Sequence, residues 1–413
     1  MAGDALPRLL TGVPGPKSRS LARQLRRYES RNVTYVSERW PIFWKRAAGA
    51  NVWDVDGNRY IDLTAGFCVA GVGHTNPRVV AALKKQAATL LHAMGDVHPN
   101  ELKLRLARAL VALTFGRWSR SEGRVIFTNM GAEAVEAALK SAAIHTKRPG
   151  VIAFEGGYHG LTYGALDTTW RPDFRAPFTK QLGHFTAHVP YGTVPQIDHL
   201  ENYGAVLVEP IQGRGGIVVP PDGFLQKLRA FCDEHNLVLI IDEIYAGFCR
   251  TGRWFACEHW GVVPDIVCVG KSLTGGLPLA ACVGRAEIMD SWPESTGEAI
   301  HTSTFLGNPM GCAAALAAIA EMKRLKLDSR SRSLGEDFKK KLLRISKVRG
   351  LGLMLGLEVG NAFPVAERLL QRGIVAIPEG SRGEILGLTP PLVIAKRQLD
   401  YCVAVLKEVL DAC

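Results

Sequence analysis

The sequence predicts an α/β fold built on a largely parallel β-sheet that helices cover on both faces. Short apolar runs that end in glycine, asparagine or aspartate alternate with helical patterns through most of the chain. Strands that are apolar throughout and separated by helices are typical of parallel sheets buried on both faces. The chain has 413 residues, of which 47% are hydrophobic, and this is enough for two or three domains with a large core.

Six apolar runs are expected to form strands, and helices are expected between several of them. The strands are predicted at Val125–Thr128, Val151–Phe154, Ala205–Val208, Leu237–Ile241, Asp265–Val269 and Ala280–Val283. The helices are predicted at Ala132–Ala143 and Gly223–His235, and a long alanine-rich helix at Gly311–Leu325. We therefore expect an N-terminal segment at residues 1–64, a large domain at 65–295, and a connecting helix with a smaller C-terminal domain at 296–413.

The composition excludes several classes of protein. Aromatic residues make up 8% and charged residues 22%, which are globular proportions, so disordered, collagen-like and coiled-coil chains are excluded. No stretch approaches about 18 uninterrupted apolar residues, so no membrane span is expected. The nine cysteines are scattered without a CxxC pair. This favours reduced thiols in a cytoplasm over a disulfide framework or a structural zinc site.

The formal charge of +11 raises the alternative of a nucleic-acid-binding protein. The excess lies in two stretches, residues 17–46 with a net +7 and residues 323–349 with a net +8, outside the central third of the chain. No zinc-finger spacing and no aromatic-basic RNA-binding pattern accompanies them. Solvated helix faces are the favoured interpretation, and no nucleic-acid partner is expected.

Two residues that follow predicted strands indicate chemistry. Asp242 comes directly after the run 237–241, and Lys271 follows the run 265–269 after one glycine. In parallel sheets function gathers where strands end at their carboxyl edge. A buried carboxylate needs a cationic partner or several hydrogen-bond donors, and a desolvated lysine becomes a nucleophilic amine. Together the two residues fit a pyridoxal phosphate site, in which a lysine forms a Schiff base and an acid pairs with the pyridinium nitrogen.

A phosphate site and an aromatic face for the cofactor are expected nearby. Gly131 and Ala132 join the strand 125–128 to the next helix, whose first N–H groups would point at a bound anion. Tyr158 lies in a glycine-rich turn after the strand 151–154 and offers a face to a planar ring. Taken alone, a plain helix start explains Gly131 and Ala132 equally well, and a glycine turn with one surface aromatic would be the preferred explanation of Tyr158.

The motifs also occur in a specific order. Asp242-Glu243, Phe248-x-Arg250-x-Gly252, Pro264-Asp265-Ile266 and Gly270-Lys271 follow one another along the chain. This series resembles the class III aminotransferases of PLP fold type I, and the similarity runs from residue 51 to about residue 392. The resemblance implies a mostly parallel seven-stranded sheet in the large domain and a smaller α+β domain formed by the N- and C-terminal segments.

The resemblance implies catalytic roles for Lys271 and Asp242. Lys271 would form the Schiff base and move the proton, and Asp242 would keep the pyridine nitrogen protonated. The implied cofactor-binding residues are Gly131, Ala132, Tyr158, His159, Glu209, Gln212, Asp242, Ile244, Lys271 and Thr304. The implied substrate pocket contains Phe67, Cys68, Glu209 and Arg214. Thr304 would reach the phosphate of a second subunit, which implies a homodimer with shared active sites.

Two positions depart from the family pattern. Ala132 stands where a serine or threonine is usual, so one hydroxyl contact to the phosphate is lost, at a cost of about 1 kcal/mol. Gly387 stands where many members have an arginine that binds the substrate carboxylate and pairs with the glutamate that is Glu209 here. Glycine supplies no such clamp, which leaves Arg214 and Arg382 as candidates for this role.

The sequence therefore predicts a cytoplasmic enzyme that moves an amino group from an amine, ω-amino acid or amino acid to a keto acid such as pyruvate or 2-oxoglutarate. Its small-molecule substrates would react in turn, with pyridoxal 5'-phosphate as cofactor and no metal. A racemase, epimerase or aminomutase on the same scaffold is the first alternative, and the glycine at position 387 favours it. A basic nucleic-acid-binding protein is the second alternative.

Overall fold

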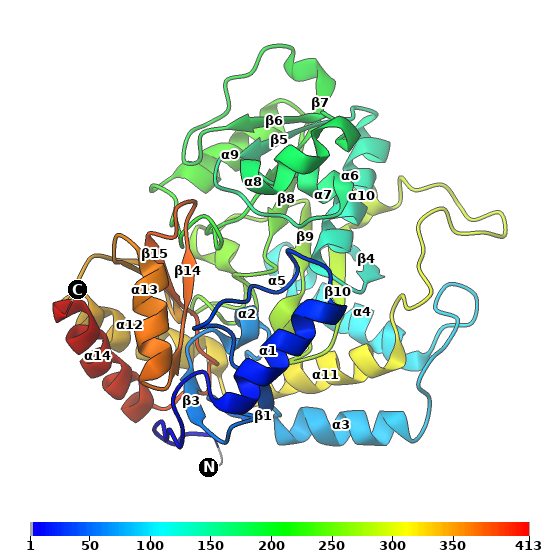
Figure 1. Ribbon diagram of the computed structural model, residues 1–413. Helices are drawn as coiled ribbons and strands as arrows, with labels where there is room; N and C mark the ends of the chain where they lie inside the picture. Colours follow the sequence, from blue (N-terminus) through cyan, green and yellow to red (C-terminus); the bar gives the residue numbers. More distant parts are fainter. Residues whose placement is uncertain (1–2, 413) are drawn as a thin grey trace.

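The computed structural model describes residues 3–412 and contains three β-sheets in two parts (Figure 1). One part holds a seven-stranded sheet with strand order β4-β10-β9-β8-β7-β5-β6. Its strands are β4 (Gly123–Thr128), β5 (Gly150–Phe154), β6 (Thr186–Val189), β7 (Tyr203–Val208), β8 (Val238–Asp242), β9 (Ile266–Val269) and β10 (Ala280–Arg285). Only β10 runs antiparallel to its neighbours, β4 and β9, so the expected mostly parallel sheet is confirmed.

The six predicted strands are all present in this sheet, and β6 is the one strand of this sheet that the sequence did not reveal. It is a four-residue strand, Thr-Ala-His-Val, at the edge of the sheet, where it pairs only with β5. Most side chains of β6 are only partly buried, so polar residues are tolerated in it. The strand therefore lacks the continuous apolar run by which the other strands were predicted.

Alternate side chains of the central strands enter two different cores. On β7, Ala205 and Leu207 pack with α6 (Gly131–Thr146), whereas Val206 and Val208 face the opposite core. The opposite core contains side chains of α4 (Glu101–Leu113), α9 (Phe224–Glu234) and α11 (Pro309–Arg324). This alternation requires apolar residues at every position of a central strand, which is the pattern seen in the sequence.

The long helix α11 begins two residues before the predicted start. The side chain of Asn308 accepts a hydrogen bond from the Gly311 N–H at 2.6 Å, and Pro309 occupies the first helical position. Both features favour a helix start. The other helices of this part are α2 (Ala65–Cys68), α3 (Pro77–Ala87), α5 (Phe115–Trp118), α7 (Tyr163–Thr168), α8 (Pro172–Arg175) and α10 (Ala286–Met289), with 3₁₀ turns at Ala176–Gln181, Leu200–Asn202, Ala256–His259 and Lys271–Leu273.

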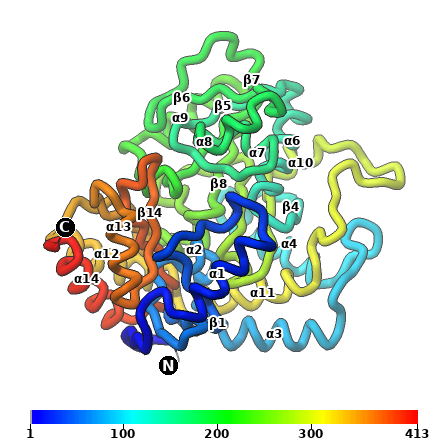
Figure 2. The backbone as a smooth tube through the Cα atoms, viewed as in Figure 1, coloured from blue at the N-terminus to red at the C-terminus, as the bar shows by residue number. Residues whose placement is uncertain are grey.

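The second part combines the two ends of the chain, which lie on the same side of the molecule in Figure 2. An antiparallel sheet with order β11-β12-β15-β14 packs with α12 (Leu327–Leu342), α13 (Ala362–Gln371) and α14 (Lys396–Asp411). Its strands are β11 (Val348–Leu351), β12 (Met354–Glu358), β14 (Ile377–Glu379) and β15 (Ile385–Leu388). In the third sheet, β1 (Trp44–Ala48), β2 (Asn51–Asp54) and β3 (Arg59–Asp62) are joined by β13 (Ile374–Val375), which is parallel to β3. The domain boundaries expected at residues 64/65 and 295/296 remain a prediction.

Arg250 joins the two parts. Its fully buried guanidinium donates hydrogen bonds through Nη1 to the carbonyl oxygens of Leu353, at 3.1 Å, and Pro390. Its own carbonyl oxygen accepts hydrogen bonds from the Leu353 N–H at 3.0 Å and from the Ser331 hydroxyl at 2.8 Å. The C-terminal part is therefore hydrogen-bonded to the loop that follows β8.

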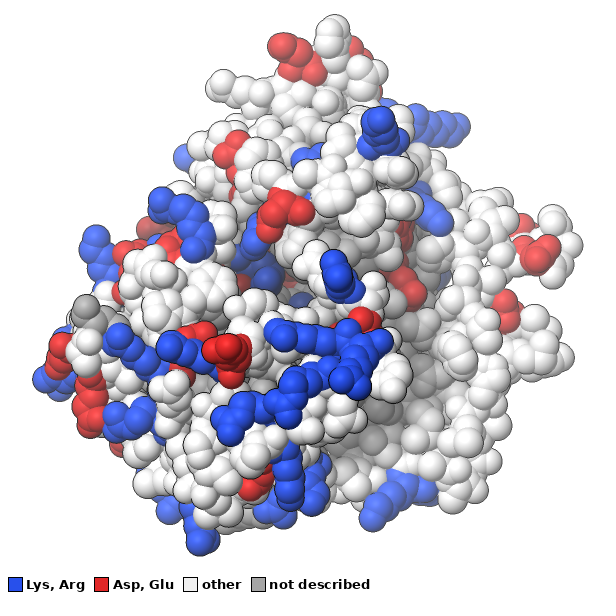
Figure 3. Space-filling model, in the orientation of Figure 1, with Lys and Arg blue, Asp and Glu red and all other residues white. Residues whose placement is uncertain are grey.

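The basic stretch near the N-terminus includes α1 (Pro16–Tyr28), and Lys and Arg side chains gather over this helix on the surface in Figure 3. Only Ser18 and Ala22 of α1 are buried, which agrees with the expectation of a solvated helix face.

No helix within residues 3–412 is long and apolar enough to cross a membrane. The eight cysteines of the same range are free and buried, and Cys413 lies outside the described residues.

Replacing Arg250 with alanine is expected to destabilise the protein strongly. The substitution leaves two buried carbonyl oxygens without a donor and creates a cavity, so we expect a loss of about 3–5 kcal/mol in the free energy of unfolding. Urea unfolding followed by tryptophan fluorescence measures this loss. Arg23→Ala on the exposed face of α1 is the control and should change stability by less than about 0.5 kcal/mol. A similar small effect of both substitutions would contradict the role of Arg250.

Glu243→Gln is expected to alter how stability depends on pH. Glu243 is fully buried, its Oε1 accepts the Cys257 N–H at 2.8 Å, and its Oε2 has no hydrogen-bond partner. Burial raises the pKa of Glu243 from 4.5 to about 7. Because the folded pKa lies above the unfolded one, this carboxyl group makes the wild type less stable as pH rises from about 4.5 to about 7.

Glutamine keeps the carbonyl acceptor and does not ionise. The variant should therefore gain stability relative to the wild type across this interval, on the order of 3 kcal/mol, and the difference should level off above it. Thermal unfolding of both proteins at pH 5 and pH 8 measures the difference. An equal difference at the two pH values would show that Glu243 does not titrate in this way.

Candidate active site

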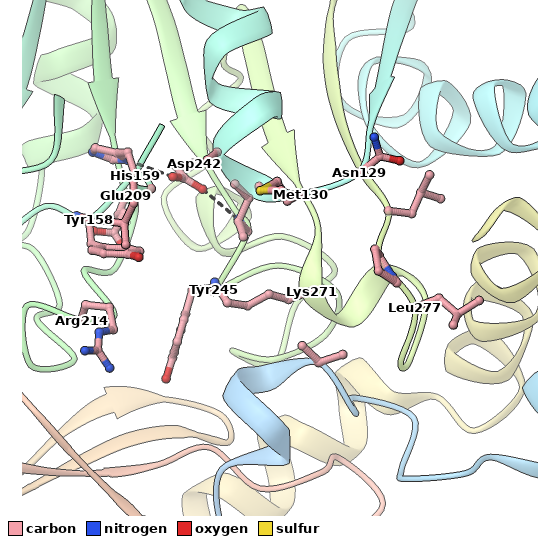
Figure 4. Close-up of a pocket in the computed structure, with 18 of the residues that line it drawn as sticks. Asn129, Met130, Tyr158, His159, Glu209, Arg214, Asp242, Tyr245, Lys271 and Leu277 are labelled. Carbon is pink, nitrogen blue, oxygen red and sulfur yellow. Dashed lines mark hydrogen bonds and ion pairs between the residues drawn. The ribbon is translucent and has the colours of Figure 1, made fainter. Parts of the chain in front are cut away.

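A cavity of about 570 Å³ lies at the carboxyl edge of the seven-stranded sheet. Asp242 is the last residue of β8, while Asn129, Tyr158, Glu209 and Lys271 each follow the end of another strand. All five residues line the cavity because parallel strands end at the same edge of a sheet. Figure 4 shows their side chains around the cavity.

Asp242 is held by two hydrogen bonds. Its side chain is 4% exposed, its Oδ2 lies 2.9 Å from Nδ1 of His159, and its Oδ1 accepts the Ile244 N–H at 3.0 Å. His159 is itself buried, and its backbone N–H donates to the Thr169 hydroxyl at 2.9 Å. The buried carboxylate therefore has a partner for each oxygen, as its desolvation requires. The imidazole of His159 thus fixes the position of the Asp242 carboxylate at the edge of the cavity.

Lys271 lies in a backbone conformation that is uncommon for a lysine. Its φ of 41° falls in the left-handed region, at the start of the 3₁₀ turn that follows β9 and Gly270. Non-glycine residues in this region are enriched at functional sites because the surrounding structure must hold them there. The Lys271 Nζ lies 5.0 Å from the centre of the Tyr245 ring, over its face. The amine and Asp242 line the same cavity.

The N-terminus of α6 offers a site for an anion. The helix begins at Gly131, no side chain caps its first N–H groups, and Gly131 and Ala132 line the cavity. Free N–H groups and the helix dipole favour a negative charge at this position. A Cβ atom at Gly131 would lie 2.8 Å from Cδ1 of Ile244, so a side chain at this position would require Ile244 to move.

Glu209 satisfies its carboxylate without an arginine. Its oxygens accept the backbone N–H groups of Tyr158 and Gly213, both at 3.0 Å. Burial raises the pKa of Glu209 to about 7, although His159 and the two N–H donors act in the opposite direction. The expectation that Glu209 lacks its family partner therefore agrees with the contacts observed.

Arg214 lines the cavity, and its ion-pair partner is a residue that the sequence did not identify. Its Nη1 lies 3.4 Å from Oε2 of Glu379, at the end of β14. In Figure 4 its guanidinium lies on the Tyr245 side of the site, away from Asp242. Arg382, the other candidate for carboxylate binding, is exposed and does not line the cavity.

Four implied residues do not line the cavity of this chain. Gln212 is buried and donates through Nε2 to the Glu155 carbonyl oxygen at 2.7 Å. Cys68 is buried, with its carbonyl oxygen bonded to the Ser272 hydroxyl, whereas Phe67 is 53% exposed. Thr304 is exposed in the loop before α11. Their roles remain predictions.

Sequence reasoning did not assign several residues that line the cavity, namely Val69, Asn129, Met130, Gly160, Leu161, Tyr245, Gly276, Leu277, Pro278 and Leu279. Two signals were available for part of this set. Tyr245 comes three residues after Asp242, and the segment 276–279 follows the glycine-containing loop after Lys271. Met130 and Leu161 had no comparable signal, because their positions depend on how α6 and the turn before α7 approach each other.

Comparisons with known proteins identify the family of this chain. The family model of the class III aminotransferases matches residues 33–410. The chain is 41% identical to an acetylornithine aminotransferase of Methanopyrus kandleri over 91% of this chain and 95% of that protein. It is 36% identical to a 4-aminobutyrate aminotransferase of Mycobacterium leprae over 97% of both chains.

A solved structure shows the same fold. The ornithine aminotransferase of Toxoplasma gondii, described with partial occupancy of PLP at its active site, superposes with a TM-score of 0.86 at 33% identity, covering 95% of this chain and 94% of that one. Because these relatives are all aminotransferases, the comparisons do not support the racemase or the nucleic-acid-binding alternative. The protein belongs to the class III aminotransferases, a family of PLP-dependent enzymes.

Proposed function

We propose that this aminotransferase binds pyridoxal 5'-phosphate covalently at Lys271 and moves an amino group from an amine, ω-amino acid or amino acid to a keto acid such as pyruvate or 2-oxoglutarate. The observation that carries the proposal is the arrangement of Lys271, the buried Asp242 and the uncapped start of α6 around one cavity. A lysine, a carboxylate and an anion site are the three groups that this cofactor requires.

The residues present fit the cofactor. The N–H groups at Gly131 and Ala132 would hold the phosphate, and Asp242, fixed by His159, would pair with the pyridine nitrogen. Tyr158 and Ile244 would contact the two faces of the ring. Gln212 would hydrogen-bond the phenolic oxygen in place of the Glu155 carbonyl oxygen, to which its amide now donates.

Lys271 would both hold the cofactor and move a proton. When bound, pyridoxal phosphate supplies an electron sink that weakens the bond between the substrate carbon and its hydrogen. The Lys271 Nζ would accept this proton and return it to another atom, and it lies over the ring of Tyr245, which limits where the amine can move. Asp242 would maintain the positive charge on the pyridine nitrogen throughout.

Arg214 is the candidate to bind the carboxylate of the keto acid. It is the arginine that lines the cavity, and a guanidinium offers donors in a geometry that matches a carboxylate. The relatives named above act on ω-amino compounds by their names, acetylornithine, 4-aminobutyrate and ornithine. This supports a donor whose amine lies at the end of a short chain.

We also propose a homodimer with shared active sites. Two segments, residues 88–99 and 290–308, project from the body of the molecule in Figure 1. They are linked by the hydrogen bond from the Thr302 hydroxyl to Asp96 at 2.8 Å and by contact of the His92 and Phe305 rings. The exposed apolar side chains on these segments are Leu90, Leu91, Met94, Val97, Ile300 and Phe305. Contiguous exposed apolar residues are typical of protein interfaces.

Thr304 lies in the second of these projecting segments, which supports its contribution to the phosphate site of a partner subunit.

The buried, unpaired cysteines support a reducing compartment, and we propose a cytoplasmic location on this basis. The division into segments 1–64, 65–295 and 296–413 is proposed as the domain organisation.

Replacing Lys271 with alanine is expected to abolish amino transfer. The variant lacks the group that holds the cofactor and moves the proton, so the half-reaction with an amine donor should slow by more than about a thousandfold. Stopped-flow absorbance of the cofactor measures the half-reaction directly. Lys227→Ala, at an exposed position of α9, is the control and should react at the wild-type rate. Unchanged turnover in the Lys271→Ala protein would end the proposal.

Mixed dimers test whether the active site is shared. One chain carries Lys271→Ala, and the other carries Thr304→Asp, whose carboxylate would repel the phosphate. Each variant alone should be inactive, whereas the mixed dimer contains one complete site and should regain about half of the wild-type activity. Purification through two different affinity tags isolates the mixed dimer. Absence of activity in the mixed dimer, or full activity of Thr304→Asp alone, would contradict the shared site.

A further inference from the structure

Glu379 fills the space that is left by the absence of a side chain at position 387. The strands β14 and β15 are antiparallel, with Ile377 paired to Gly387 and Glu379 paired to Ile385. A Cβ atom at Gly387 would lie 2.8 Å from Cγ of Glu379. A negative side chain therefore lies where the family resemblance led us to expect a positive one.

The carboxylate of Glu379 is buried with few partners. Its side chain is 0% exposed, and its Oε1 accepts the Tyr245 hydroxyl at 3.3 Å. Its Oε2 has no hydrogen-bond partner, and Arg214 Nη1 at 3.4 Å is its ion-pair contact. Burial raises the pKa of Glu379 to about 7, while Arg214, the Tyr245 hydroxyl and Lys271 act to lower it. A buried carboxylate of this kind needs a cation beside it.

Arg214 is the partly exposed member of this pair. Its backbone is fixed, since its carbonyl oxygen accepts the Gly380 N–H at 3.1 Å. Its side chain is 29% exposed, and within residues 3–412 Glu379 is the only acid that it pairs with. Because Glu379 is fully buried, loss of the guanidinium would leave an unpaired buried carboxylate unless another cation takes its place. The cavity is the source of such a cation, because both partners of Glu379, Arg214 and Tyr245, line it.

We propose that Glu379 determines donor specificity by favouring amines that carry a second ammonium group at the far end of a short chain. This proposal rests on the proposed function. The distal ammonium group would replace the guanidinium of Arg214 at the free Oε2 of Glu379. If the far end of the donor carries a carboxylate, this carboxylate would compete with Glu379 for the guanidinium of Arg214. A donor with a neutral far end would contact neither Glu379 nor Arg214.

Three donors of equal chain length separate these cases: 1,4-diaminobutane, butylamine and 4-aminobutanoate. The half-reaction is followed by cofactor absorbance without any keto acid, so acceptor binding does not enter. In Glu379→Gln the second-order rate constant of the half-reaction with the diamine, divided by that with butylamine, should fall by roughly tenfold. A change of this size is expected for the loss of one desolvated charge contact. The value for 4-aminobutanoate should rise, because Arg214 is released.

Arg214→Ala should give the opposite pattern, with a higher ratio of diamine to butylamine and a lower value for 4-aminobutanoate. Glu384→Gln removes a carboxylate that accepts the Arg382 N–H and does not line the cavity, so its three ratios should equal those of the wild type. Cofactor absorbance and the unfolding temperature establish that each variant is folded and loaded.

The outcomes separate the inference from the proposed function. If no amine reacts with the wild type, the proposed function fails. If the wild type reacts but Glu379→Gln changes all three donors by the same factor, Glu379 has only a structural role and the inference is overturned. A ratio of diamine to butylamine that falls in Arg214→Ala would overturn it as well.

Discussion

The active site depends on one constraint, a carboxylate that is held out of water at the carboxyl end of β8. Asp242 is buried there because β7 and β9 flank its strand on both sides, and His159 and the Ile244 N–H satisfy its two oxygens. Without these partners the burial of the charge would destabilise the sheet. Lys271 reaches the same edge from the neighbouring strand, in a left-handed conformation that the turn after β9 maintains. The sheet thus brings the carboxylate of Asp242 and the amine of Lys271 to the wall of the same cavity.

The C-terminal part of the chain completes this edge and determines the charge at its far side. Arg250 bonds this part to the loop after β8, so β14 and β15 have a fixed position relative to the cavity. At that position the chain has a glycine at 387 and a buried glutamate at 379. The positive charge is supplied by Arg214 from a different loop, and this arginine forms an ion pair with Glu379. The far end of the cavity therefore holds an arginine that is paired with an acid, which differs from a free arginine clamp.

Much of this architecture was predictable because its signals are local. The apolar runs before Asp242 and Lys271 place both residues at strand ends, and a glycine that opens a helix indicates an anion site. The contact between Glu379 and Arg214 was not predictable, since it depends on the register of β14 against β15 and on the path of a loop 165 residues away in the sequence. Strand β6 escaped prediction because half of its residues are polar. Contacts between subunits likewise lie beyond what one chain specifies, which is why Thr304 remains a proposal.

The central claim is that Lys271 holds the cofactor while Asp242 lies against its ring nitrogen. Borohydride reduction of the coloured enzyme, followed by proteolysis and mass spectrometry, tests this claim most directly. We expect one peptide, the one that contains Lys271, to carry a reduced pyridoxyl group in amounts that match the cofactor content. A fully loaded enzyme in which Lys271 stays unmodified, or in which the group lies on another lysine, would contradict the account.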